Sequence, residues 1–293
     1  CNCTYPEFAM TTLPLPIAAL AAASYVVPGL VAPFFRRMML TPRRYVRPPP
    51  VLAIPDADER IDLGGGLVAW RWGGGGPAVP TVLLVHGFEG NRSQFGAILE
   101  ALLARGLSVV ALDVPAHGES LGDELTAVKF VAAIERTLDR LGPVHAVVGH
   151  SMGGAMSLFS LAQRGGARRA ALVSAPSSLK RELQRFAGAV GLSKRGARAF
   201  IASVEKHVGR PAADFDIRHI AGKVKLPVLM IHDQTDRQVP VAEAARSAHM
   251  LPDAELIVTR GLGHNRLLAD PAVVTAIVDF VSDQAMTGSA SIS

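Results

Sequence analysis

A serine between glycines follows an apolar run near the middle of this 293-residue chain. Residues 147–156 read VVGHSMGGAM, so Ser151 is the central residue of a Gly-x-Ser-x-Gly motif. The pattern predicts a strand, a sharp turn and a helix, and such a turn forces the serine into a strained backbone conformation. The hydroxyl then projects from the turn, beside the first N–H groups of the helix. We therefore interpret Ser151 as a nucleophile.

A serine hydroxyl attacks a carbonyl efficiently only when a base takes its proton. Two later segments supply a base and an acid to orient it: DQTDRQVP at 233–240 and GLGHN at 261–265. We predict that His264 is the base and Asp236 its acid, in the chain order serine, acid, histidine. Asp233 is the competing acid. Asp236 is preferred because it lies just before the Val-Pro pair that ends its segment.

The oxyanion formed in such an attack needs N–H donors aimed at it. The segment HGFEG at 86–90 follows another apolar run, and we expect the backbone N–H groups of Phe88 and Met152 to be these donors. The side chain of His86 is predicted to shape the loop. Asp113 and His117, in DVPAHGES, are predicted to do the same through hydrogen bonds.

The elements that position these residues alternate between strands and helices from about residue 58 onward. RIDL and LVAWRW predict a hairpin across Gly64–Gly66, and the glycines at 73–76 predict a second hairpin turn. Longer strands are predicted at 81–86, 107–113, 144–149, 169–175, 227–232 and 254–259. Helices are predicted at about 93–105, 124–140, from 152, 241–250 and 271–285. This alternation predicts an α/β fold with a mostly parallel sheet, flanked by helices, and ligands bind at the carboxyl edge of such sheets.

An insertion at about 177–223 contains helical stretches and no predicted strand, which indicates a short helical cap above that edge. Many of its residues are small, so we expect a pocket for short to medium acyl chains. Six apolar residues recur at helical spacing and could face the cleft, although packing on the sheet is the preferred role for each: Leu183, Phe186, Val190, Phe200, Ile201 and Val204.

The first 50 residues form a predicted apolar arm and a Pro-rich linker, and residues 51–293 the globular domain. Residues 11–35 are uncharged and long enough to span a bilayer, and Arg36 and Arg37 follow at once. Positive flanking residues favour a membrane-associated protein with its domain in the cytoplasm. The alternative is an arm packed on the domain or on a second subunit of a soluble cytoplasmic protein. Residues 1–9 have the composition of a cloning remnant.

Composition excludes several other classes of protein. The net charge is +5, but the arginines are scattered and not interleaved with aromatic residues, so we expect no nucleic-acid partner. The only cysteines are Cys1 and Cys3, which form no disulfide framework. The spacing of the histidines at 86, 117, 145 and 150 does not suit a metal site.

Together, HGFEG, DVPAHGES, GHSMGG, DQTDRQVP and GLGH resemble the α/β-hydrolase fold superfamily, in the order that esterase- and lipase-type serine hydrolases with a short cap show. The resemblance covers roughly residues 58–285 and implies a Ser-His-Asp triad and no cofactor. One departure is Asp233, where the family often has glycine after the histidine of the acid strand. Dehalogenase and epoxide-hydrolase members use an aspartate nucleophile, so Ser151 argues against both.

The resulting prediction is a carboxylic ester hydrolase that forms an acyl-enzyme with a small-molecule acyl ester. Three alternatives stay open: a serine-dependent relative that cleaves a thioester, amide or carbon–carbon bond, a long-chain lipase, and a non-catalytic binding module of the same fold. The last is disfavoured because Ser151, Asp236 and His264 are all present.

Overall fold

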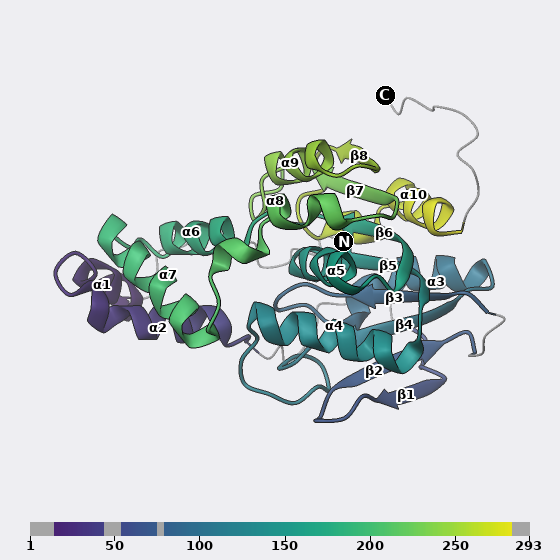
Figure 1. Ribbon diagram of the computed structural model, residues 1–293, viewed down its shortest axis with the longest axis horizontal. Coiled ribbons are helices and arrows are strands. Elements are labelled where there is room, and N and C mark those ends of the chain that lie inside the picture. Colours follow the sequence, from purple (N-terminus) through teal and green to yellow (C-terminus); the bar gives the residue numbers. More distant parts are fainter. Residues whose placement is uncertain (1–14, 44–53, 75–78, 283–293) are drawn as a thin grey trace.

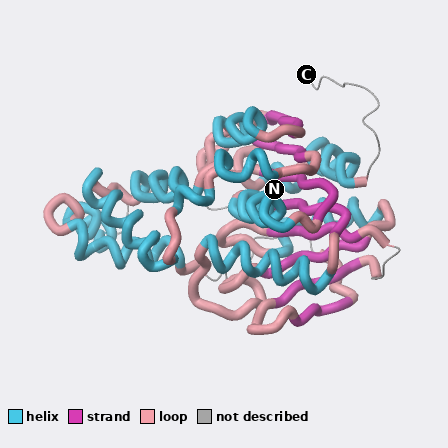
Figure 2. Tube along the Cα trace, viewed as in Figure 1, coloured by secondary structure: helices cyan, strands magenta, loops and turns pink. Residues whose placement is uncertain are grey.

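A twisted sheet forms the centre of the computed structural model, which describes residues 15–43, 54–74 and 79–282 (Figures 1 and 2). Within that part of the chain the sheet has eight strands in the order β1-β2-β4-β3-β5-β6-β7-β8. They are β1 (Glu59–Asp62), β2 (Val68–Trp72), β3 (Thr81–Val85), β4 (Ser108–Asp113), β5 (Val144–His150), β6 (Ala167–Val173), β7 (Val228–Asp233) and β8 (Ala254–Thr259). Strand β2 is antiparallel to both neighbours, and the pairs from β4 to β8 are parallel. The predicted fold class is confirmed.

Helices cover both faces of the sheet and bury a separate apolar cluster on each. One face carries α4 (Ala127–Leu141), α5 (Met152–Arg164), α8 (Ile217–Ile220) and α9 (Ala242–Met250). The other carries α3 (Gly96–Ala104) and α10 (Pro271–Val281). Because both faces are covered, β3, β5 and β7 are almost wholly buried, which is why they read as unbroken apolar runs.

The two predicted glycine turns have different outcomes. Gly64–Gly66 joins β1 to β2 in a hairpin, and all three glycines have positive φ. The second hairpin is wrong, because β4 lies between β2 and β3 and pairs with both. The glycine run therefore begins a connection between strands that are not neighbours. Residues 75–78 lie outside the described residues.

The arm and the cap form a third layer beyond the carboxyl edge of the sheet, at the left of Figure 1. The arm contributes α1 (Leu15–Ala23) and α2 (Pro28–Leu40), and the cap α6 (Leu179–Ala189) and α7 (Lys194–Val208). Ser24, between the arm helices, accepts a hydrogen bond from the Ser193 N–H at 2.9 Å. The layer has its own apolar cluster, built around Ala21, Val31, Phe35, Leu183, Ala187, Val190, Phe200, Val204 and Ala212.

The described residues do not form the predicted bilayer span. The first helix ends at Ala23, and Pro28, which has no N–H to continue a helix, begins a second helix that folds back on the cap. Neither these helices nor any other described helix is both long and apolar enough to cross a membrane. The alternative of an arm packed on the domain is the one observed. Residues 11–14 of the predicted span, and residues 1–9, lie outside the described residues.

This packing also corrects the expectation for the apolar cap residues. Phe200 is fully buried, but against the arm helices and α6 rather than against the sheet. Phe186 stacks beside it with ring centroids 5.3 Å apart. The periodicity thus identified a buried helix face correctly and assigned it the wrong partner.

Candidate active site

Ser151 occupies the sharp turn between β5 and α5, with φ 53° and ψ −127°. A non-glycine residue in such a conformation costs about 1–3 kcal/mol, and the surroundings must hold it there. The Ser151 N–H donates to the Val173 carbonyl at 2.8 Å. A Cβ at Gly149 would lie 2.5 Å from the Cα of Gly154, and one at Gly153 would overlap the Val85 carbonyl oxygen. The turn therefore requires these glycines and presents the serine at the carboxyl edge of the sheet.

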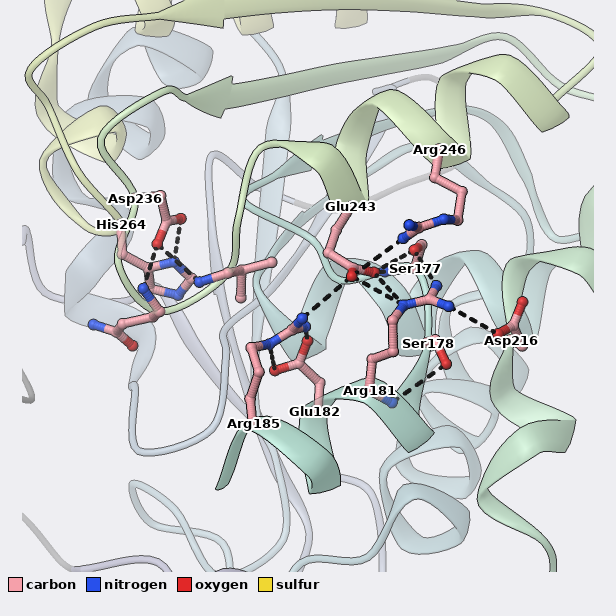
Figure 3. Close-up of polar contacts among 12 residues, drawn as sticks. Ser177, Ser178, Arg181, Glu182, Arg185, Asp216, Asp236, Glu243, Arg246 and His264 are labelled. Carbon is pink, nitrogen blue, oxygen red and sulfur yellow. Dashed lines mark hydrogen bonds and ion pairs between the residues drawn. The ribbon is translucent and has the colours of Figure 1, made fainter. Parts of the chain in front are cut away.

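An imidazole–carboxylate pair lies beyond the ends of the last two strands of the sheet, β7 and β8 (Figure 3). Asp236 follows β7 and His264 follows β8, and His264 Nδ1 is 2.7 Å from Asp236 Oδ2. Both residues are buried. The other carboxylate oxygen, Oδ1, accepts hydrogen bonds from the N–H groups of Gln238 at 2.8 Å and Val239 at 2.9 Å. The structure thus brings the predicted acid and base together.

The charge state of this pair follows from its contacts. Burial raises the pKa of Asp236, but hydrogen bonds from His232 and His264 outweigh burial and bring it well below its ordinary value. The carboxylate is therefore ionised near neutral pH and accepts the Nδ1–H of His264. In a neutral imidazole this leaves Nε2 as the basic nitrogen.

His232 is a contributor to this pair that the sequence analysis missed. Its Nε2 lies 2.7 Å from the Val239 carbonyl oxygen and 3.3 Å from Asp236 Oδ2, and its ring is fully buried. The position of His232 on a buried strand, four residues before the acid, was the available signal.

Asp233, the competing acid, makes different contacts. Its Oδ1 accepts hydrogen bonds from the N–H of Thr235 at 2.8 Å and from its hydroxyl, and its Oδ2 from the Thr259 hydroxyl at 2.8 Å and the Leu262 N–H at 3.0 Å. Burial raises the pKa of Asp233, but these donors outweigh it and bring the pKa far below the ordinary value. Asp233 ties the loop after β7 to the loop after β8, and so to the segment that carries His264.

The loop after β3 lies directly against the serine. A Cβ placed on Gly87 would be 2.9 Å from the Ser151 Cβ. His117 Nδ1 pairs with the Pro115 carbonyl at 2.9 Å, which leaves Nε2 to accept the Glu89 N–H at 2.8 Å. His86 Nε2 accepts the Val114 N–H at 3.2 Å, and burial lowers the pKa of His86 to about 3. Both imidazoles shape the loop, as predicted.

The predicted oxyanion donors, Phe88 and Met152, directly follow Gly87 and Ser151, the two residues that lie against each other. Phe88 follows Gly87, and Met152 is the first residue of α5. Among the described residues, neither backbone N–H donates a hydrogen bond to another protein group. Both residues line the same cavity as Ser151.

That cavity has a volume of about 320 Å³ and contains Ser151 and His264 in its wall. The sheet domain supplies Phe88, the cap Leu183 and Val204, and the arm Met39 and Leu40. Apolar walls with a few convergent polar groups are typical of sites for small organic ligands. The sequence analysis missed the arm residues. The available signal was that Val31, Phe35 and Met39 recur at a helical spacing. This spacing indicates a helix with one buried face, whereas a helix surrounded by lipid needs no such face.

A buried ion-pair cluster joins the cap to the sheet domain beside the site (Figure 3). Glu243, on α9, is 3% exposed. It pairs with Arg181 Nε at 2.9 Å, Arg185 Nη1 at 3.2 Å and Arg246 Nη1 at 3.2 Å, and it accepts the Ser177 hydroxyl. Because α6 carries Arg181 and Arg185, the cluster fixes the position of the cap over the carboxyl edge.

This cluster predicts an acid-sensitive stability. Burial raises the pKa of Glu243, but Ser177 and the arginines bring it from its ordinary 4.5 to about 2. The ionised carboxylate therefore stabilises the fold above pH 4.5, by roughly 3 kcal/mol, and this is lost as the pH falls from about 4.5 to 2. Glu243→Gln should lower Tm strongly at pH 7 and by much less near pH 3. Thermal scans across this range check it, with the exposed Glu255→Gln as control; equal losses at both pH values would contradict it.

The sequence as a whole also matches a known family. Residues 82–277, which contain Ser151, Asp236 and His264, match the model of the alpha/beta hydrolase family. The chain belongs to this family. The predicted resemblance is confirmed.

Relatives differ in how much of the chain they share. A pimeloyl-[acyl-carrier protein] methyl ester esterase from Xanthomonas campestris is 28% identical over 227 residues, covering 63% of this chain and 88% of that protein. The dihydrolipoyllysine-residue acetyltransferase component of an acetoin cleaving system from Pseudomonas putida is 40% identical over 107 residues, or 35% of this chain. The match spans only 28% of that protein's length. Mouse alpha/beta hydrolase domain-containing protein 10 superposes with TM-score 0.60 at 19% identity, over 77% of this chain and 96% of its own, which shows a shared fold.

Proposed function

We propose that this hydrolase-family protein is a serine-dependent carboxylic ester hydrolase. The observation that carries the proposal is that His264, paired with the buried Asp236, lines the same cavity as the strained Ser151. Such a pair activates a hydroxyl only where the base can reach it. An esterase among the relatives supports the choice of an ester.

In the proposed reaction the Ser151 hydroxyl oxygen attacks the ester carbonyl carbon while His264 Nε2 takes the hydroxyl proton. The carbonyl electrons move to oxygen, which the N–H groups of Phe88 and Met152 stabilise. As the C–O bond breaks, the imidazolium gives its proton to the leaving alcohol, and Asp236 stabilises the positive ring. Water, deprotonated by His264, then attacks the acyl-enzyme and releases the acid and the serine.

The test is a graded panel of substrates assayed with and without a serine-directed phosphonate. Ester hydrolysis that the phosphonate abolishes is the expected result. Matched thioesters and amides in the same panel separate the alternatives, since a relative specialised for those bonds would cleave them faster than the ester. No phosphonate-sensitive turnover of any substrate in the panel would contradict the proposal and leave cleavage of a carbon–carbon bond and the binding module as the alternatives.

Cavity size predicts the preferred chain length. A volume of 320 Å³ lies near the lower end of ligand pockets, which run from about 300 to 1,000 Å³. Each buried methylene improves binding by about 0.8 kcal/mol until the cavity is full. We expect kcat/KM on p-nitrophenyl esters to peak at about two to eight acyl carbons. A maximum at about sixteen carbons would instead indicate a lipase with an opening cap.

A surface lipid contact of the arm remains a prediction. Val26 is 80% exposed, Leu30 79% and Tyr25 66%, and residues 15–43 contain no acidic residue. Exposed apolar groups beside arginines favour the surface of an anionic bilayer. Flotation should recover the protein with anionic vesicles at low salt, and Leu30→Glu should lower the recovery several-fold. Leu121→Glu, at a 68% exposed position outside the arm, is the control; equal recovery of both variants would contradict the contact.

A further inference from the structure

The arm does more than cover the cap, because its C-terminal end enters the candidate site. Met39 and Leu40, at the end of α2, line the same cavity as Ser151. The Leu40 carbonyl accepts the Leu125 N–H at 2.8 Å, which joins the end of α2 to the segment before α4. The wall formed by α2 is therefore attached to the sheet domain as well as to the cap.

Just beyond α2, Arg43 reaches the loop after β3. Its Nε lies 2.9 Å from Glu89 Oε1 and its Nη2 2.8 Å from Oε2, and its backbone N–H donates to Oε1 at 3.1 Å. A guanidinium that pairs with both carboxylate oxygens fixes orientation as well as distance. Glu89 is the residue after Phe88, the predicted oxyanion donor.

Glu89 is held from two sides. Its backbone has φ 59°, in the left-handed region, and its N–H is bound by His117 Nε2 at 2.8 Å. Its side chain is 19% exposed and receives the Arg43 contacts. Burial raises the pKa of Glu89, but the Arg43 hydrogen bonds outweigh burial and lower it. The conformation of the Phe88–Glu89 peptide thus depends on one contact from the loop after β4 and one from the arm.

The arginine itself is 70% exposed, so the ion pair should contribute little to global stability. Its position is nevertheless defined, because Phe35 on α2 is fully buried against the cap. A contact that is weak in stability but fixed in place can orient a loop without determining whether the protein folds.

We propose that the N-terminal arm is a working part of the substrate site: Leu40 limits the acyl chain, and Arg43 is a positioning residue that orients the Phe88 loop through Glu89. The positioning role of Arg43 rests on the proposed function, since an oxyanion loop matters only for carbonyl chemistry. The role of Leu40 concerns the cavity itself and applies to any apolar ligand.

The positioning role is tested with Arg43→Gln, Arg43→Lys, Glu89→Gln and the Arg43→Gln/Glu89→Gln double variant. Arg37→Gln, at an exposed arginine on α2 in the same arm, is the matched control. Oxyanion stabilisation acts in the transition state, so kcat should fall about tenfold or more with KM within about twofold. The lysine variant should keep part of the activity, and the double variant should lose no more than the larger single loss, because both changes remove one interaction.

Unchanged kcat in the Arg43 and Glu89 variants would overturn the positioning role, as would a rise in KM alone or a Tm loss that accounts for the activity loss.

The role of Leu40 as a wall that limits the acyl chain is tested by comparing Leu40→Ala with Leu30→Ala, the same change at a 79% exposed site on α2. Leu40→Ala should raise kcat/KM for esters longer than the wild-type optimum, by roughly fourfold for each additional methylene buried. An identical chain-length profile for both leucine variants would overturn it.

Failure of the proposed function is recognisable separately. It would appear as wild-type protein with no phosphonate-sensitive turnover. In that case the binding of fatty acids of graded length, measured by calorimetry, tests the wall directly. Leu40→Ala should still accept longer chains than wild type, and unchanged length dependence would overturn the role of the arm.

Discussion

Replacing Ser151 with alanine is expected to lower kcat/KM for esters by about 10⁴ to 10⁶ while the protein stays folded. Alanine cannot form the acyl-enzyme, so only slow attack by water on the bound ester would remain. Stability should change little, because the strain at φ 53° belongs to the backbone and is shared by both residues. Initial rates on purified protein, with Tm beside them, measure both effects.

Ser174 provides a matched control for this variant. It is a buried serine at the end of the adjacent strand β6, and it has the same φ of 53°. Among the described residues, its hydroxyl makes one hydrogen bond, a long one of 3.4 Å to the His264 carbonyl. Ser174→Ala should therefore cost less than about tenfold in kcat/KM. Near wild-type turnover in Ser151→Ala, or an equal loss in Ser174→Ala, would contradict the assignment of the nucleophile.

Asp236→Asn is expected to lower kcat by about 10³ to 10⁴. The two N–H groups of Gln238 and Val239 require an acceptor on one side of residue 236, so an asparagine would place its oxygen there. Its NH₂ group would then face His264 Nδ1, which must become an acceptor. The imidazole proton would move to Nε2, the nitrogen that has to take the serine proton, and the base would be lost.

Asp233→Asn, in contrast to Asp236→Asn, should mainly lower the stability of the fold and have a much smaller effect on kcat. Asp233 accepts from Thr235, Thr259 and Leu262, and an amide can accept on only one of its two sides. The variant should lose about 1–3 kcal/mol of stability, through unsatisfied buried groups, and far less kcat than Asp236→Asn. Rates measured below the Tm of both variants make the comparison. The reverse ranking in kcat would move the acid assignment to Asp233.

Much of the fold and the geometry of the site could be predicted because local rules specify them. Strands buried on both faces require continuous apolar runs, which mark β3, β5 and β7 in the sequence. The serine turn requires glycine at 149 and 153 for steric reasons, so it also appears as a motif. Parallel strands then bring their carboxyl ends to one edge, which is why residues far apart in sequence, such as Asp236 and His264, could be expected to meet.

The arm could not be placed in this way. A bilayer and an apolar cap favour the same composition, so the hydropathy of residues 11–35 does not distinguish them. The distinction depends on Pro28 and on a complementary face of α7 around Phe200, more than 160 residues away. The contact between Arg43 and Glu89 is equally non-local, and neither residue stands out in the sequence. The helical spacing of Val31, Phe35 and Met39 indicates a buried face of the arm, but only the assembled fold determines which elements that face and Arg43 contact.

The central claim, that Ser151 forms the acyl-enzyme, is tested most directly by mass spectrometry of the trapped intermediate. The full chain is mixed with a p-nitrophenyl ester and acid-quenched before the steady state, and its peptides are mapped. We expect one acyl group per chain, on Ser151, in an amount that matches the initial burst of p-nitrophenol. The acyl adduct should be absent in Ser151→Ala. When a phosphonate replaces the ester, a phosphonyl group should instead be found on Ser151 and should persist, because water does not release it as it releases the acyl group. An acyl group on another residue, or turnover and burst without any adduct on Ser151, would contradict the account.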